Sequence, residues 1–268
     1  MKLILTLLVR DEVDIIRQNI LYHLNQGVDF VIATDNGSKD GTKEILHEFV
    51  NQKVLKYIYE SEYSHSQSKW VTQMLDIARE EFAADLVINS DADEFWWPKK
   101  GNLKSVLDNV RPNNAVLYVQ RNDFMPVKDQ TKSIFERMII RDTSGLNGIG
   151  RPLPPKIITR PIEGFTISAG NHDVENFSMF RRYKKAKFEN IEILHFPMRS
   201  YAQFAKKIEQ GAQALLNFHE NLTATRVWLV LYEKLKAGTL EEYYYSRVGL
   251  KNVEDSRLRD FMKFREII

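Results

Sequence analysis

The sequence predicts an α/β fold, in which a mostly parallel sheet is flanked by helices and followed by a C-terminal helical extension. Three observations support this class. Short apolar runs alternate with segments of helical periodicity through the first half of the chain, residues beyond 200 show helical periodicity alone, and 43% of the residues are apolar. In a chain of 268 residues that composition is enough for a sizeable core.

The first half alternates strand and helix signals in order. The third helical segment, for example, carries Trp70, Met74, Ile77 and Ala78 along one face. The resulting βαβαβαβ order predicts a parallel sheet with helices on both faces. The expected strands are residues 3–9, 28–34, 54–59 and 85–89, and the expected helices are residues 11–25, 43–50 and 66–82.

The second half has shorter and less regular signals. Residues 142–155 are rich in Gly and Pro, which is typical of a loop. Short strands are expected at residues 115–120, 134–140, 156–159, 165–168 and 191–195, and helices at residues 201–217, 222–236 and 254–266.

Charge, cysteine content and the apolar start limit the function classes. The 38 basic and 36 acidic residues give a net charge of +2, which argues against a nucleic-acid partner. Because no cysteine is present, disulfides, thiolate metal sites and cysteine nucleophiles are excluded, in keeping with a reducing cytoplasm. The apolar run at residues 1–9 is too short to cross a bilayer and lacks a small-residue cleavage site. We therefore expect a soluble, cytoplasmic protein.

Polar clusters follow three of the expected strands, at residues 10–12, 35–42 and 91–94. In an open parallel sheet, ligands bind beyond the carboxyl ends of the strands. The three clusters should therefore converge in one crevice.

The cluster after the fourth expected strand contains two carboxylates that suit a metal ion. Asp91 and Asp93 are two positions apart, so both can face one point in a tight turn. Two hard oxygen ligands suit Mg²⁺ or Mn²⁺, and such an ion can neutralise a diphosphate leaving group. The alternative is a solvated acidic turn before a helix near Asn102.

The cluster at residues 35–42 has the composition of a loop. Asp35 or Asn36 can bind a base or ribose through hydrogen bonds, and the glycines permit close backbone approach. The alternative is a strand-to-helix turn in which Ser38, Asp40 or Thr42 caps the helix.

Taken together, these runs resemble a known family. LLVRDE, VDFVIATDNGSKDGT and ADLVINSDADEFWWP, followed later by IEILHFPMRSYAQF, resemble glycosyltransferase family 2 and its relatives, which share the GT-A fold and a DxD motif. The resemblance covers residues 1–210. It implies a GT-A-like domain at 1–200, with a nucleotide-binding half at 1–98 and an acceptor half at 99–200, followed by a helical extension at 201–268.

The resemblance also implies an activity and its ligands. The expected enzyme is a glycosyltransferase of the hexosyltransferase type. It moves a sugar from a nucleotide-sugar donor, with UDP as the default nucleotide, to a hydroxyl of a glycan or lipid-linked acceptor. The transfer is expected to proceed with inversion and to require Mn²⁺ or Mg²⁺. Asp91, Asp93 and His195 are the implied metal ligands. The implied nucleotide-sugar-binding residues are Val9, Arg10, Glu12, Asp35, Asn36, Asp91, Ala92, Asp93 and Arg199.

Two positions depart from the family pattern. Many relatives have Asn where Asp11 stands, and a second Asp where Asn36 stands. An asparagine both donates to and accepts from a base edge, so the choice of base is left open. For His195 the alternative is a hydrogen-bonded histidine at a strand end, and for Arg199 a solvated helix face.

An inverting transfer needs a base that takes the proton of the acceptor hydroxyl. The segment at residues 168–177 offers His172, Asp173 and Glu175 after a strand-like run, and we favour Asp173. Glu94 and Glu136 are rivals. The alternative is an ordinary polar loop.

Other functions are kept open. The aromatic and basic tail beyond residue 201 is either an acceptor-binding or peripheral membrane-surface element or, as we favour, a helical core with solvated faces. A nucleotidyltransferase would show a Gly-rich basic loop after the first strand, which LLVRDE lacks. A catalytically degenerate nucleotide- or carbohydrate-binding module would bind the donor without turnover.

Overall fold

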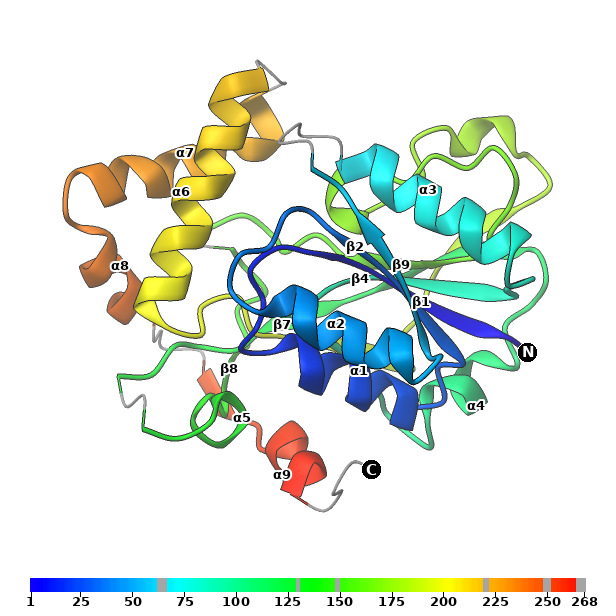
Figure 1. The fold of residues 1–268 in the computed structure, drawn as a ribbon, viewed down its shortest axis with the longest axis horizontal. Coiled ribbons are helices and arrows are strands. Elements are labelled where there is room, and N and C mark those ends of the chain that lie inside the picture. Colours follow the sequence, from blue (N-terminus) through cyan, green and yellow to red (C-terminus); the bar gives the residue numbers. More distant parts are fainter. Residues whose placement is uncertain (62–66, 129–130, 148–149, 219–221, 248–251, 264–268) are drawn as a thin grey trace. The chain divides into compact units, whose positions relative to one another are not determined.

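A computed structural model of the chain describes residues 1–61, 67–128, 131–147, 150–218, 222–247 and 252–263, and divides the chain into two compact units (Figure 1). The first unit comprises Met1–Arg121 and Pro154–Ile193, and the second comprises Asn122–Leu153 and Leu194–Ile268. The expected extension at 201–268 thus belongs to a larger unit. Whether residues 1–200 act as one functional domain stays a prediction.

The first unit is built on a seven-stranded sheet with the order β10-β6-β9-β4-β1-β2-β3. Most pairs are parallel, and β9 alone is antiparallel to its two neighbours, β4 and β6. The strand order reverses between β1 and β4, which creates the topological switch point where open sheets bind ligands. The strands are β1 Leu3–Val9, β2 Phe30–Asp35, β3 Leu55–Tyr59, β4 Leu86–Asp91, β6 Asn114–Val119, β9 Lys156–Thr159 and β10 Lys184–Lys187.

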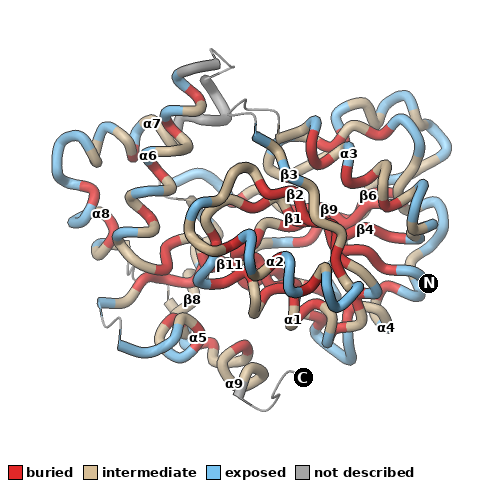
Figure 2. Tube along the Cα trace, viewed as in Figure 1, coloured by how far each residue is buried: buried red, intermediate tan, exposed pale blue. Residues whose placement is uncertain are grey.

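Helices cover both faces of this sheet, as the sequence predicts. Figure 1 shows α3 (Gln67–Glu80) on one side and α1 (Ile16–Asn25) and α2 (Thr42–Asn51) on the other. The face of α3 with Met74 and Ala78 packs against Ile4, Ile32 and Val87 of the strands. β1 and β4 are buried along nearly their whole length (Figure 2). β1 is almost continuously apolar, as parallel strands with two covered faces are, whereas β4 is apolar only in its first three residues. A short helix, α4 (Leu103–Leu107), is capped by Asn102.

The second unit is mainly helical. Its core contains Phe204, Ile208, Leu231, Leu240 and Tyr244. Nowhere in the described part of the chain does a helix have the length and apolarity needed to cross a bilayer. The elements are α5 Ile134–Arg137, β8 Ile140–Asp142, α6 Tyr201–Phe218, α7 Leu222–Lys236, α8 Leu240–Ser246, β12 Asn252–Glu254 and α9 Arg257–Lys263. The chain passes between the units within β7 (Arg121–Asp123), between Leu153 and Pro154, and within β11 (Ile191–His195).

Two expected strands are wrong. Residues 134–140 form α5 and only the start of β8, because Ser133 and Glu136 make a capping box that begins a helix. Residues 165–168 contribute a single bridge, between Ile167 and Val174. The elements that were not expected include β5 (Glu94–Pro98), which the sequence presents as a turn, the lysine-rich β10, and the tyrosine-rich α8.

Candidate active site

The loops after β1 and β2 are joined by hydrogen bonds, as their predicted convergence requires. The backbone N–H of Asp11 donates to Ser38 Oγ at 3.0 Å, and the N–H of Lys39 donates back to Asp11 Oδ1 at 2.7 Å. The N–H of Glu12 donates to Thr42 Oγ1 at 2.8 Å. Asp11 has a φ of 55°, a left-handed conformation that few non-glycine residues adopt. The cross-loop hydrogen bonds hold it there.

Asp35 anchors the turn at the end of β2. Its fully buried carboxylate accepts from the N–H of Ser38 at 2.9 Å and from the Tyr57 hydroxyl at 3.0 Å. Burial and the neighbouring Asp35 raise the pKa of Tyr57, so the phenol stays protonated and donates. Asn36 follows, and its N–H donates to Val9 O at 2.9 Å. The structure brings Val9, Asp35 and Asn36 together, and their contact with a nucleotide stays a prediction.

The turn after β4 is fixed from α1. The side-chain amide of Asn19 donates to Ala92 O at 2.9 Å and to Glu94 O at 2.7 Å. Within this turn Asp91 has 32% of its side chain exposed, whereas Asp93 is 1% exposed. Asp91 is therefore the carboxylate of this pair that faces solvent, at the end of the strand beside β1.

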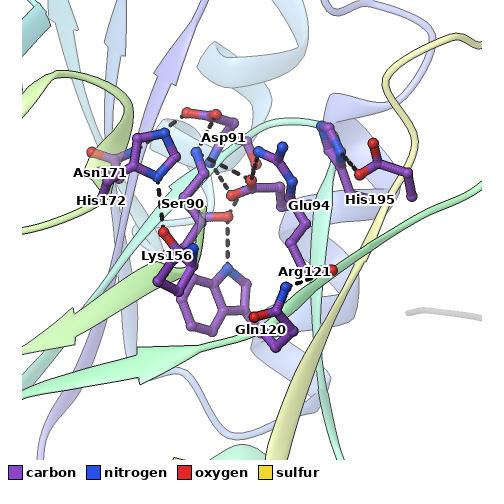
Figure 3. A network of polar contacts seen from close by, with 12 residues as sticks. Ser90, Asp91, Glu94, Gln120, Arg121, Lys156, Asn171, His172 and His195 are labelled. Carbon is purple, nitrogen blue, oxygen red and sulfur yellow. Dashed lines mark hydrogen bonds and ion pairs between the residues drawn. The ribbon is translucent and has the colours of Figure 1, made fainter. Parts of the chain in front are cut away.

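A buried lysine contacts this turn from β9 (Figure 3). Lys156 Nζ lies 2.5 Å from Asp91 Oδ2 and 3.1 Å from Glu94 Oε1. Arg121 adds a second cation, 3.9 Å from the same Glu94 oxygen. Burial lowers the pKa of Lys156, but Asp91 and Glu94 raise it by more, so the net pKa is above its ordinary value. The site thus contains a protonated ammonium between two carboxylates.

Asn171 and His172 complete the cluster (Figure 3). Asn171 is fully buried and donates to Asp91 Oδ1 at 3.2 Å, and among the described residues its own Oδ1 has no hydrogen-bond partner. His172 Nδ1 lies 2.8 Å from Pro155 O, which can only accept, so Nδ1 carries the proton. Burial, and next the Lys156 charge, lower the pKa of His172 to about 4. The imidazole is therefore neutral near pH 7, with its lone pair on Nε2.

The other two candidate bases have different surroundings. Asp173 accepts from Lys185 Nζ at 2.5 Å and from the Tyr118 hydroxyl at 2.7 Å. Burial raises the pKa of Asp173, but these two donors lower it by more, so the net pKa is below its ordinary value. Glu175 is exposed, and its backbone N–H donates to Thr166 O.

Arg10 follows directly after β1 and is half-buried. Three further candidates lie in the second unit. His195 is 8% exposed and has its Nδ1 2.7 Å from Asp123 Oδ1. Arg199 is fully buried and donates to Phe196 O at 3.2 Å. Glu136 caps α5 and so has a structural role. The predicted roles of His195 and Arg199 stay predictions.

The surroundings of Asp91 do not fit a divalent ion. One carboxylate oxygen contacts the Lys156 ammonium and the other contacts Asn171. A second cation at Asp91 would be repelled by that ammonium over a short distance. Over the described ranges of the chain, no group of three or more His, Asp or Glu side chains is arranged to hold a metal ion. The requirement for Mn²⁺ or Mg²⁺ therefore stays a prediction.

The sequence did not predict three residues of the cluster around Asp91. Lys156 and Arg121 belong to segments that carry no recognisable motif. Asn171 lies in the segment at residues 168–177, from which only its neighbours were chosen as candidates. One signal was available, because Lys156 begins an apolar run with strand character, and lysine is rarely fully buried unless it is paired.

The fold and the cluster at the switch point define a class of α/β proteins that bind ligands beyond the carboxyl ends of a parallel sheet, in keeping with the predicted GT-A-like architecture. Residues 6–228 match the model of glycosyltransferase family 92, and the chain belongs to that family. The narrower resemblance to family 2 is not confirmed. A comparison with curated proteins gives no match.

Matches among solved structures include TarS from S. aureus and a synthase from Mycobacterium tuberculosis. Residues 1–349 of TarS from S. aureus share 14% identity at a TM-score of 0.40, over 93% of this chain and 76% of that one. The same fragment in complex with UDP shares 15% at 0.41, with equal coverage. Glucosyl-3-phosphoglycerate synthase from Mycobacterium tuberculosis, in complex with Mn²⁺, UDP and phosphoglyceric acid, shares 13% at 0.41, over 78% of each chain.

Proposed function

We propose that this glycosyltransferase moves a hexosyl group from a nucleoside diphosphate sugar to a hydroxyl of a glycan or lipid-linked acceptor, with inversion. Family membership supports the reaction class. The observation that carries the proposal is the pairing of Leu8 with Asp91, which puts the ends of β1 and β4 side by side at the switch point. Uridine is the first base to test.

We assign the base to His172 rather than to Asp173, the residue that the sequence favoured. Asp173 is held by Lys185 and Tyr118, and accepting a proton would weaken both contacts. His172 is neutral, and its Nδ1–H is fixed by Pro155, so Nε2 is available as an acceptor. Glu94 is fully buried against Lys156 and is excluded as a base by that pairing.

The proposed step is a direct displacement. The acceptor oxygen forms a bond to the anomeric carbon while the bond from that carbon to the diphosphate oxygen breaks. The acceptor proton passes to His172 Nε2, and the nucleoside diphosphate leaves with the electron pair. Since Asp91 does not fit a divalent ion, no part of this step is assigned to one.

The first experiment is a thermal-shift panel with UDP, GDP, CDP and dTDP, each with and without Mn²⁺. A ligand that binds only the folded state raises the melting temperature. A shift with one nucleotide supports the donor site and identifies the base, and dependence on Mn²⁺ that Asp93→Ala abolishes would support the predicted metal. No shift at concentrations well above a millimolar dissociation constant would contradict the donor site.

A second experiment tests the base by donor turnover. His172→Gln keeps a polar side chain but cannot take up a proton, so we expect kcat to fall about 10²- to 10⁴-fold while the nucleotide-induced melting shift is retained. Asp173→Asn is the matched comparison and should retain more activity. The reverse ranking would return the role to Asp173. A nucleotide shift without turnover in the wild type would favour a degenerate binding module.

A further inference from the structure

One edge of the first unit carries an unusual concentration of positive charge. Residues 179–187 read MFRRYKKAK, with five basic residues and no acidic one. They run from the end of a short 3₁₀ turn, Phe177–Met179, into β10. β10 is an edge strand of the seven-stranded sheet, with β6 as its neighbour. We call Met179, Arg181, Arg182, Lys184 and Lys187 the basic edge.

Aromatic side chains anchor the backbone of the basic edge to the core of the first unit. Phe177, Phe180 and Tyr183 pack against the core of the first unit, and the rings of Phe180 and Phe165 meet edge to face at 4.7 Å. The side chains between these anchors point outward. Met179 is 77% exposed, the largest exposure among the exposed apolar side chains of the described residues.

The four cations of the basic edge are all exposed and form no ion pair within the described residues. Arg182 has one contact of another kind, a cation–π contact with the Tyr183 ring at 4.8 Å. Lys185, the fifth basic residue, is half-buried and pairs with Asp173 at 2.5 Å. Ordinary solvated surfaces intersperse both signs of charge, which this segment does not.

Protection of a sheet edge explains only part of this pattern. Lysines on an edge strand discourage pairing with other chains, which accounts for Lys184 and Lys187. Arg181, Arg182 and Met179 precede β10 and have no ladder to protect. A row of unpaired cations beside an exposed thioether side chain suits a surface that is anionic outside and apolar beneath.

We propose that the basic edge docks on an anionic lipid bilayer, with the four cations at the headgroups and Met179 inserted between them. Each basic residue near an anionic membrane contributes about fivefold in partitioning, so four give on the order of several hundredfold. Within the same unit, Lys185 of β10 forms an ion pair with Asp173, which is the residue next to His172. Docking would therefore favour a lipid-linked acceptor, a consequence that rests on the proposed function, whereas docking itself does not.

The test is sedimentation of the purified full chain with vesicles at 0.1 M salt. We expect binding to vesicles of phosphatidylcholine with 30% phosphatidylglycerol, and little to phosphatidylcholine alone. Replacing Arg181, Arg182, Lys184 and Lys187 with Glu should reduce the binding at least a hundredfold. The matched control places the same four charge reversals at Lys43, Lys53, Lys99 and Lys100, which are exposed and lie elsewhere on the first unit. It has the same net charge and should bind more tightly than the edge variant.

Several outcomes decide between docking and its alternatives. Equal loss in the edge variant and the control would overturn the proposal, because net charge alone would then explain binding. Equal binding of the wild type to both vesicle types would also overturn it. If the edge variant does not fold, the wild type itself is tested by raising salt to 0.5 M, which should release it from the anionic vesicles. The nucleotide-induced melting shift is measured on the same proteins without vesicles, so failure of the donor site and failure of docking are seen separately.

Discussion

Two regions at the carboxyl ends of the strands are built in different ways. The loops after β1 and β2 are joined by backbone N–H groups that donate to side chains 27 to 30 residues away, such as Asp11 to Ser38 and Glu12 to Thr42. The turn after β4 is held by buried charges from much further along the chain. Lys156 and Asn171 contact Asp91 from 65 and 80 residues away.

The two regions should differ in how much stability the protein loses when a single contact is removed. A neutral hydrogen bond contributes about 1 kcal/mol, and its loss in a half-buried turn exposes groups that water can reach. Removing one member of a buried ion pair leaves an uncompensated charge, which costs about 3–5 kcal/mol. The β4 turn should therefore depend on single side chains, whereas the joined loops should share their stability among several bonds.

The largest expected effect is that of Lys156→Met. This substitution removes the ammonium and leaves Asp91 and Glu94 close together, so the free energy of unfolding should fall by about 3–5 kcal/mol. Chemical denaturation followed by circular dichroism measures it. Because the remaining penalty comes from two carboxylates, it should shrink as the pH is lowered and they become protonated.

Lys56→Met is the matched control. Lys56 forms an equally short ion pair with Glu81, but the two side chains are 34% and 49% exposed. An exposed pair contributes about 0–1 kcal/mol, so the control should remain close to the wild type. Equal effects of the two substitutions would remove the distinction between the regions.

The same contrast explains what the sequence could predict. The alternation of β1 to β4 with three helices, and the polar clusters at their ends, depend on short-range patterns and were predicted correctly. Lys156 and Asn171 reach Asp91 only through the sheet order and the antiparallel insertion of β9, which no local pattern specifies. Residues 134–140 failed for the opposite reason, because a local capping box outweighed an apolar run with strand character.

A second prediction concerns pH and the support beneath the β4 turn. His23 is fully buried, with Nδ1 donating to Asn19 O at 2.8 Å and Nε2 accepting from the N–H of Trp96 at 3.3 Å. Burial lowers its pKa to about 4, although the Asn19 carbonyl opposes the shift. Since the unfolded histidine titrates near ~6.5, the unfolded state binds the proton first as the pH falls. Stability should be complete above pH ~6.5 and decrease toward pH ~4, by on the order of 3 kcal/mol.

Urea denaturation at pH 7.5, 5.5 and 4.5 measures this slope for the wild type and His23→Gln. The variant should be less stable at pH 7.5 but should have a flatter dependence on pH. The slope that remains reports in part on His172, whose pKa is also lowered to about 4. His47→Gln, a substitution of an exposed histidine, is the control. An unchanged slope in His23→Gln would contradict the assignment.

The smallest effect is expected in the joined loops. Ser38→Ala removes the acceptor of the Asp11 N–H and should cost about 1 kcal/mol. Asp11→Asn is the matched control, because asparagine tolerates the left-handed backbone and keeps an oxygen that can accept from Lys39. It should lie within about 0.5 kcal/mol of the wild type. If Ser38→Ala instead cost as much as Lys156→Met, the loop would depend on one bond as strongly as the β4 turn depends on one buried charge, and the two regions would no longer differ in kind.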